Sequence, residues 1–273
     1  MSVARPVKGL KDRNPKDRIT IPCGKCVACL ENRRKEWEIR LKKEIEVSTS
    51  ALFVTLTYQD SYIPRTEEGL MTLDKRDVQL FMKKLRKTCK SKLKYYLAGE
   101  YGDIYERPHY HMILFNLEPP YDYNLQSAWQ EIGEEIGYVD IRKVTPGRIR
   151  YTTGYIANKK PSALNRQTEF ALMSLGLGKN YVEKAKKWHK HNSIFYVNDY
   201  DYSFNLPRYF RNKIFTEEEI ALQKLKSIRP LGEKRDKEIK RLKKLTNNPT
   251  EYEIAQIKQY EKRKIEKNKK LRL

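Results

Sequence analysis

The sequence predicts an α+β protein in which helices pack against an antiparallel sheet. Two observations support this fold class. Strand-like and helix-like segments follow one another in the order strand, helix, strand, strand, helix, strand, helix. The second and third strand segments are separated by only a short Gly-flanked loop, which is typical of an antiparallel hairpin.

The first elements are predicted from hydrophobic periodicity. Residues 31–48 are expected to be helical, because Trp37 and Leu41 recur at four-residue spacing among charged residues. Residues 51–60 read ALFVTLTYQD, a β-branched and aromatic run typical of a strand. A helix is then expected over 74–89, with an apolar stripe that can cover a sheet face.

The later elements follow from the same rules. We expect strands at 93–102 and 109–117, a helix at 124–136, a strand at 138–144 and a helix at 148–160, which ends before Pro161.

Composition divides the chain into three parts. Residues 1–30 form a basic arm with a Cys cluster, 31–215 form the main domain, and 216–273 form a charged helical tail. Within the main domain, 165–215 show little periodicity, although 193–198 can add a short strand.

The charge of the chain indicates its partner. Of the 273 residues, 57 are Lys or Arg and 35 are Asp or Glu, which gives a formal net charge of +22. Nucleic acid is the expected partner, because binding to phosphates neutralises this charge and releases counterions. A membrane surface is the weaker alternative, since we find neither an amphipathic anchor nor an apolar run near the roughly 20 residues of a span. The polar N-terminus also lacks the apolar segment of a secretory signal, so we expect a reducing cytosol.

Three cysteines are crowded near the N-terminus. Cys23, Cys26 and Cys29 have a spacing that a metal can use, but a structural Zn site requires four ligands. Cys89 can be the fourth only if its helix packs nearby. Reduced, partly buried thiols are the alternative.

A pair of histidines gives the first chemical signal. In a strand, His109 and His111 project from the same face, and two such imidazoles are a natural pair of ligands for a divalent ion. A solvated histidine pair is the alternative reading. If the flanking strands form a hairpin, Glu100 returns beside the pair and completes an open site that suits Mg²⁺ or Mn²⁺. Glu106 is a rival carboxylate.

Two tyrosines give the second signal. Tyr151 and Tyr155 lie four residues apart and share one face of the predicted helix with Lys159. A phenol that attacks a phosphodiester forms a covalent phosphotyrosine, provided that a cation offsets the charge of the transition state. The alternative is that both rings pack on the sheet, since the chain contains 19 Tyr.

Taken together, these segments resemble the HUH endonuclease superfamily. FVTLTY at 53–58 is similar to its first motif, GEYGDIYERPHYHMILF at 99–115 to its metal-binding motif, and YTTGYIANKK at 151–160 to its nucleophile motif. Across about 20–215 the chain resembles the replication initiators of gokushovirus-type microviruses. It departs from the pattern at Tyr110, where the family generally has an aliphatic residue, and that side chain should face away from the metal.

The resemblance implies a sheet of about five antiparallel strands with the His pair on a central strand. It also implies that the protein nicks and rejoins single-stranded origin DNA to start rolling-circle replication. The products would be a 5′-phosphotyrosine adduct and a free 3′-OH. The implied roles are metal binding by His109, His111 and Glu100, nucleophilic attack by Tyr155 or Tyr151 with Tyr155 preferred, catalysis by Lys159, and DNA binding by Lys160, Arg107 and Arg150.

Two other functions remain open at this stage. The chain can be a basic nucleic-acid-binding protein without enzymatic activity, or a relaxase or transposase with the same chemistry. Because we find no Gly-rich phosphate loop, duplex unwinding would fall to a host helicase, with a host polymerase extending the 3′-OH in the bacterial cytoplasm. A second H-x-H, at His189 and His191, follows a Lys-rich stretch and is expected at a solvated or DNA-facing surface.

Overall fold

The structure is a computed structural model. It describes residue 24, residues 26–155, 165–199, 202–224 and 226, and scattered positions between 237 and 263. One compact unit comprises Ala28–Ile214, and a second comprises Met1–Val27 and Phe215–Leu273. The site described below lies entirely within the first unit.

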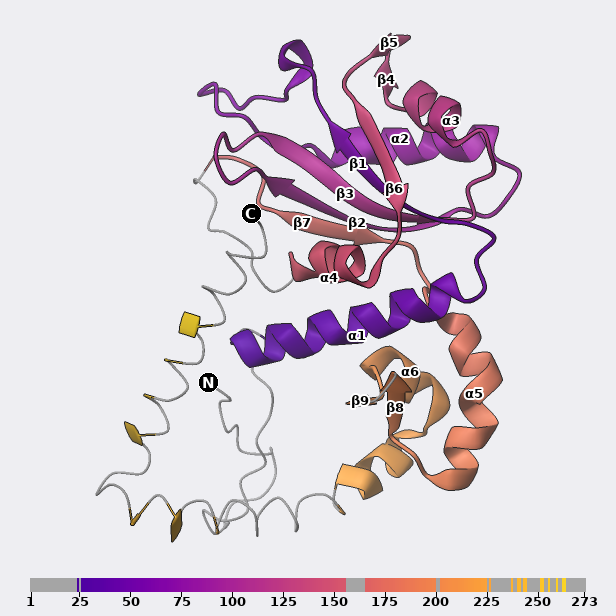
Figure 1. Ribbon diagram of the computed structural model, residues 1–273, viewed down its shortest axis with the longest axis vertical. Coiled ribbons are helices and arrows are strands. Elements are labelled where there is room, and N and C mark those ends of the chain that lie inside the picture. Colours follow the sequence, from indigo (N-terminus) through magenta and orange to yellow (C-terminus); the bar gives the residue numbers. More distant parts are fainter. Residues whose placement is uncertain are drawn as a thin grey trace. The chain divides into compact units, whose positions relative to one another are not determined.

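The centre of this unit is a five-stranded sheet in which every pairing is antiparallel, as the sequence predicted (Figure 1). The order across the sheet is β6 (Val139–Lys143), β1 (Ala51–Thr57), β3 (Pro108–Phe115), β2 (Lys94–Tyr101) and β7 (Phe170–Met173). The central strand is therefore β3, which bears the His pair.

Register places specific residues beside the His pair. Strands β2 and β3 form the expected hairpin, in which Glu100 lies opposite His109. On the other side of β3, Thr55 of β1 lies opposite His111. Because side chains alternate between the faces of a strand, Thr55, Glu100 and both imidazoles share one face of the sheet.

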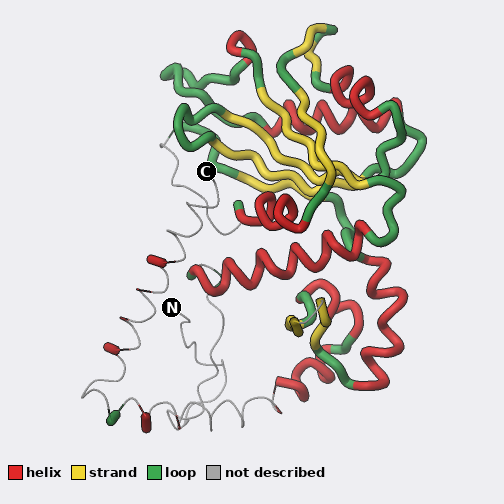
Figure 2. Tube along the Cα trace, in the orientation of Figure 1, coloured by secondary structure: helices red, strands yellow, loops and turns green. Residues whose placement is uncertain are grey.

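The opposite face of the sheet carries the larger apolar core. Helix α2 (Lys75–Thr88) and helix α3 (Tyr121–Ala128) cover it, as Figure 2 shows. Tyr110 points into this core and its hydroxyl group donates to the carbonyl oxygen of Asp74, 2.8 Å away. It therefore faces away from the His pair, as expected. Asp74 also caps α2, because its side chain accepts a hydrogen bond from the backbone N–H of Arg76.

Helix α1 (Val27–Ile45) and helix α4 (Pro146–Gly154) cover the His-bearing face. Leu41 of α1 and Ile149 of α4 pack with Tyr96 and Phe115 of the sheet in a smaller core cluster. The Trp37 ring also lies 5.1 Å from the ring of Tyr96, measured between centroids. The charged helix α1 is thus anchored by the apolar stripe that the sequence revealed.

The predicted helix at 124–136 is wrong. Helix α3 ends at Ala128, and a short hairpin follows, formed by β4 (Gln130–Glu131) and β5 (Glu134–Glu135). Its two turn residues, Ile132 and Gly133, both have positive φ, at 49° and 86°, as a tight hairpin turn requires. Because the apolar residues at 125, 129, 132 and 136 also fit a helical stripe, periodicity alone was misleading.

The segment with little periodicity contains more structure than predicted. After β7 come α5 (Lys179–Asn192), the hairpin of β8 (Tyr196–Asp199) and β9 (Tyr202–Asn205), and α6 (Arg208–Ile214). A 3-10 turn, η2 (Asp60–Tyr62), follows β1. Gly178 starts α5 at a φ of 75°, where a Cβ atom would lie 2.9 Å from the carbonyl oxygen of Arg40.

Most of the tail at 216–273 lies outside the described residues. Its first part, residues 217–224, is helical as predicted. Among the described residues, no helix combines the length and apolar character that a membrane span needs.

Candidate metal centre and tyrosine pair

Three side chains of the central hairpin converge on one point. The Nε2 atoms of His109 and His111 each lie 2.8 Å from the same oxygen, Oε1 of Glu100. The potential ligand atoms of these three residues all lie within 4.8 Å of one another, so this group can hold a metal ion. It is the only such group of His, Cys, Asp or Glu in the part of the chain that the structure describes.

Burial and neighbouring groups fix the orientation of the imidazoles. The Glu100 residue is 4% exposed and His111 8%. Nδ1 of His109 lies 3.0 Å from the carbonyl oxygen of Arg107 and must donate to it, because a carbonyl oxygen only accepts. Nδ1 of His111 lies 3.2 Å from the Thr55 hydroxyl group, and the ring stacks on Phe53. Both Nε2 atoms are therefore directed at Glu100, the arrangement that metal-binding histidines use.

The cluster controls the ionisation of its members. Burial by itself would raise the pKa of Glu100, but hydrogen bonds from the two imidazoles outweigh it and bring the pKa to about 2. Burial likewise lowers the pKa of His111, whereas for His109 the Glu100 carboxylate outweighs burial and raises the pKa. A carboxylate held ionised between two imidazoles is a strong attractant for a divalent cation.

Both tyrosine rings lie against this cluster. The hydroxyl group of Tyr151 is 3.0 Å from Oε1 of Glu100 and 3.4 Å from Nε2 of His111. The Tyr155 ring stacks on His111, with ring centroids 6.2 Å apart, and lies edge to face with the Tyr151 ring at 5.2 Å. The sequence predicted that these two rings and the His pair act together, and the structure brings all four rings to one place.

Helix α4 presents the tyrosines because its ends and its inner face are defined by polar contacts. Thr145 caps the start by accepting from the backbone N–H of Arg148, and Pro146 takes the first helical position. Tyr155 follows directly after the last helical residue and keeps right-handed backbone angles (φ −66°, ψ −19°). The Tyr-x-x-x-Tyr spacing therefore spans the end of α4 and still puts both rings on one side.

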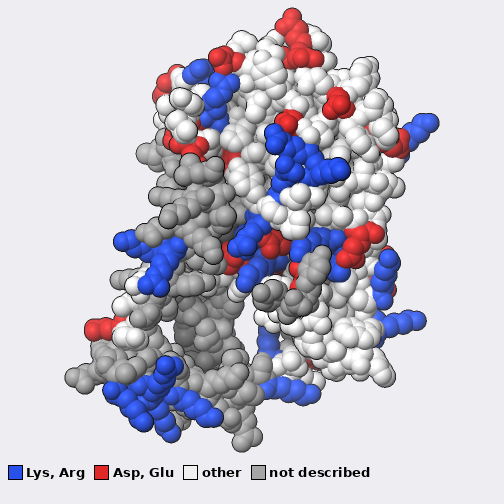
Figure 3. All heavy atoms as spheres, in the orientation of Figure 1, with Lys and Arg blue, Asp and Glu red and all other residues white. Residues whose placement is uncertain are grey.

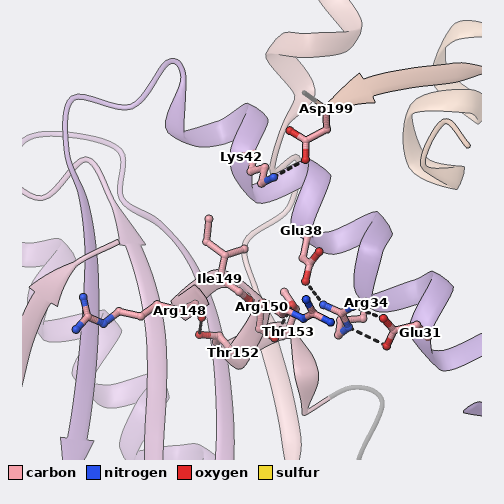
Figure 4. A network of polar contacts seen from close by, with 10 residues as sticks. All are labelled: Glu31, Arg34, Glu38, Lys42, Arg148, Ile149, Arg150, Thr152, Thr153 and Asp199. Carbon is pink, nitrogen blue, oxygen red and sulfur yellow. Dashed lines mark hydrogen bonds and ion pairs between the residues drawn. The ribbon is translucent and has the colours of Figure 1, made fainter. Parts of the chain in front are cut away.

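A polar network on α1 lies beside α4 (Figure 4). Arg34 is 5% exposed and binds the carboxylates of Glu31 and Glu38. Burial raises the pKa of Glu38, while Arg34 and then Arg150 of α4 oppose the increase. Arg150 is exposed, as a DNA-binding residue would be, and part of its charge acts on Glu38.

Other predicted residues lie elsewhere. Glu106, the rival carboxylate, is exposed and pairs with Arg166. Arg107 binds Asp60 and the Tyr58 carbonyl oxygen, so its guanidinium group braces the loop after β1. Predictions for Lys159 and Lys160 lie outside the described residues.

The Cys cluster is described only in part. Cys23 lies outside the described residues, whereas Cys26 and Cys29 are half-buried and form no disulfide with each other or with Cys89. The zinc hypothesis for Cys23, Cys26 and Cys29 stays a prediction.

Sequence reasoning missed two residues beside the cluster. Thr55 was recognised as part of a strand, and pairing its alternation with that of the His strand would have revealed its contact with His111. Glu169 is 2% exposed and lies close enough to His109 for its charge to raise the pKa of that imidazole. No local pattern signals Glu169, because it follows a segment without periodicity.

The fold and this site define a class of protein that comparisons with known proteins identify. Residues 51–160 match a family model whose description begins with Replication-associated protein ORF2. This range runs from β1 through α4 and includes every member of the metal and tyrosine cluster. No solved structure matches the chain.

Three relatives place the chain more closely. It is 30% identical to Replication-associated protein ORF2 of Spiroplasma virus 4 over 251 residues, which cover 81% of this chain and 75% of the relative. It is 28% identical to Replication-associated protein ORF4 of Chlamydia phage 1, over 70% of this chain and 53% of the relative. It is also 28% identical to Replication-associated protein VP4 of Bdellovibrio phage phiMH2K, over 60% of this chain and 58% of the relative. The chain therefore belongs to this family of microvirus replication-associated proteins, as the resemblance predicted.

Proposed function

We propose that this protein initiates rolling-circle replication by nicking and rejoining single-stranded phage origin DNA. The observation that carries the proposal is the position of the Tyr151 hydroxyl group, 3.0 Å from Oε1 of Glu100 and 3.4 Å from Nε2 of His111. A nucleophile must lie within reach of the group that activates the scissile phosphate, and this geometry provides it. Family membership supports the role in replication.

The residues of the cluster fit a divalent ion. His109, His111 and Glu100 would hold it, and two nitrogens with one carboxylate oxygen leave coordination positions for water and phosphate, which suits Mg²⁺ or Mn²⁺. Such an ion would polarise the scissile phosphate and offset the negative charge that develops during attack.

The chemistry of the chain itself is a balanced transfer. The phenolic oxygen of Tyr151 forms a bond to phosphorus, the bond from phosphorus to the 3′ oxygen breaks, and the departing oxygen takes a proton to become the free 3′-OH. The protein remains joined to the 5′ end through phosphotyrosine. Because the energy of the phosphodiester is retained in the adduct, attack by a 3′-OH can reverse the reaction and close a circle.

The second tyrosine allows a second transfer. With the Tyr155 ring against both Tyr151 and His111, one tyrosine can hold the 5′ end while the other cleaves a newly made origin. Lys159 and Lys160 would steady the phosphate. The sequence favoured Tyr155 as the first nucleophile, but the measured hydroxyl contacts favour Tyr151, and we propose that Tyr151 attacks first.

The proposed partner is phage DNA in the cytoplasm of a bacterial host, with host helicase and polymerase acting on the nicked product. Lys and Arg side chains gather over α4 and the neighbouring part of α1 on the face shown in Figure 3. Such a surface attracts a polyanion to the side of the molecule where the tyrosine helix lies. Arg107 and Arg150 would contribute to this attraction.

Adduct formation tests the proposal. The full chain, incubated with Mn²⁺ and a single-stranded origin oligonucleotide, is expected to give a covalent protein–DNA band that EDTA prevents. Tyr151→Phe/Tyr155→Phe should abolish the band, whereas Tyr123→Phe, an exposed tyrosine on α3, should leave it unchanged. A band of normal intensity from the double variant would refute the assignment.

The single variants separate the two tyrosines. On the geometry described here, Tyr151→Phe should lose the first cleavage and Tyr155→Phe should keep it. The opposite result would restore Tyr155 as the first nucleophile.

A further inference from the structure

A second pocket, remote from the metal cluster, combines cations with aromatic rings. It has a volume of about 360 Å³ and is formed by α1 and α6, which belong to the same compact unit. Four of its lining residues are cationic: Arg33, Arg40, Arg208 and Lys213. The single carboxylate in the lining is Glu36, so the pocket has a net formal charge of +3, from four positive groups and one negative group.

Within the described residues, the cations of this pocket are not neutralised by close ion pairs. Arg33, Arg208 and Lys213 are exposed, and no described carboxylate lies within ion-pair distance of any of the three. Arg40 is half-buried, and its Nε donates to the carbonyl oxygen of Leu177. Burial lowers the pKa of Arg40, so the fold tolerates a partly desolvated positive charge here. An anionic ligand would relieve that cost.

Two aromatic rings complete the pocket. The guanidinium carbon of Arg40 lies 3.9 Å from the ring centroid of Trp37 and 4.2 Å from that of Tyr209. Both rings are half-buried and line the pocket, so each leaves part of its surface accessible. Alternating guanidinium and aromatic groups are the surface on which unpaired bases stack while cations hold the phosphates.

The pocket lies over the face of the sheet that bears the metal cluster. Trp37 contacts both Arg40 and Tyr96, and Tyr96 precedes Glu100 by four residues on β2. Four residues of strand span roughly 13 Å, which is the length scale of a few nucleotides. A single strand that leaves the tyrosines can therefore reach the pocket without crossing to the other face.

From these observations we propose that the α1–α6 pocket binds single-stranded nucleic acid, with phosphates on Arg33, Arg208 and Lys213 and a base against Tyr209 or Trp37. This binding does not depend on cleavage, and its test is therefore independent of the proposed nicking activity. A duplex stacks its bases internally, so the pocket should prefer a single strand.

The charge arm of the test removes three exposed cations. Arg33→Gln/Arg208→Gln/Lys213→Gln is compared with a matched control, Lys184→Gln/Lys186→Gln/Lys187→Gln, which removes three exposed lysines of α5. Binding of the full chain to a short fluorescein-labelled oligothymidylate is measured by anisotropy in EDTA over a range of salt concentrations. The pocket variant should bind about tenfold more weakly, and its slope of log K against log salt should fall by about 2, since each single-strand phosphate contact contributes about 0.7.

The stacking arm changes one ring without changing charge. Tyr209→Leu should weaken binding about tenfold at every salt concentration and leave the slope unchanged, as expected for loss of a stacked base. Tyr123→Leu, at an exposed tyrosine of α3, serves as its control.

Three outcomes would overturn the inference. The first is an equal loss of binding and slope in the α5 control, which would show that only total charge matters. The second is equal affinity for duplex DNA. The third is competition by polyglutamate as effective as that by unlabelled oligothymidylate, which would indicate a general anion surface. All readouts use EDTA and unmodified Tyr151 and Tyr155, so absence of a covalent adduct would refute the nicking activity and leave the pocket supported.

Discussion

Two His-x-His sequences in this protein have opposite fates. In β3, His109 and His111 lie on one face and share the Glu100 carboxylate. In α5, residues two apart point in different directions, so His189 is fully buried and His191 is exposed. Nε2 of His189 lies 2.7 Å from the hydroxyl group of Tyr181, and its Nδ1 lies 2.7 Å from the carbonyl oxygen of Ile194.

The comparison shows that the same three-residue pattern becomes a ligand pair or a structural anchor according to the element that carries it. Strand β3 directs two imidazoles at one carboxylate. Helix α5 uses a single imidazole to tie its C-terminal end to the following chain. The expectation that the second pair lies at a surface is therefore wrong for His189, which is a core residue.

The largest expected effect separates the two pairs by chemistry. His109→Ala removes one of three proposed ligands and should reduce Mn²⁺-dependent adduct formation about a hundredfold or more, because the ion then loses both a bond and its position. Gel analysis of the adduct over time measures this rate. Near-normal activity in the variant would remove the basis for a metal site on β3.

His189→Ala should have the reverse profile. It leaves the Tyr181 hydroxyl group and the Ile194 carbonyl oxygen without their partner in a buried site, and should lower the free energy of unfolding by about 2 kcal/mol. Urea denaturation measures the loss, and calorimetric titration with Mn²⁺ should give an unchanged affinity. A loss of metal binding with intact stability would mean that the two pairs had been assigned to the wrong roles.

A smaller effect sharpens the description of the β3 pair. Thr55→Val keeps the β-branched shape but removes the hydroxyl group that contacts Nδ1 of His111, and should weaken Mn²⁺ binding about tenfold. Thr57→Val is the matched control, since Thr57 lies on the same strand and face and contacts a backbone oxygen of Tyr138 instead. Equal effects in both variants would show that the hydroxyl group does not orient the imidazole.

The smallest effect is expected at His191. His191→Ala removes an exposed side chain from the end of α5 and should leave the urea midpoint, Mn²⁺ affinity and adduct yield within experimental error of the parent. A clear loss of any of the three would reveal a role that burial and contacts do not indicate.

Several parts of the site could be predicted because they depend on local geometry. Alternation along a strand is enough to place His109 and His111 on one face, and a short loop is enough to return Glu100 beside them. Other parts could not. Helix α5 was hidden because its Lys-rich sequence has few apolar residues, and the hairpin at Ile132 and Gly133 was hidden by a spacing that also fits a helix.

The sequence by itself determined the antiparallel α+β sheet, the central His-bearing hairpin and the tyrosine segment, because two-residue and four-residue periodicities act over a few neighbouring positions. Only the tertiary structure decided that Tyr151 reaches Glu100, that His189 is buried, and that Arg33 and Arg40 meet Arg208 and Lys213 in one pocket. These contacts join residues far apart in the chain, and their formation depends on how whole helices pack on the sheet. No local pattern encodes that packing.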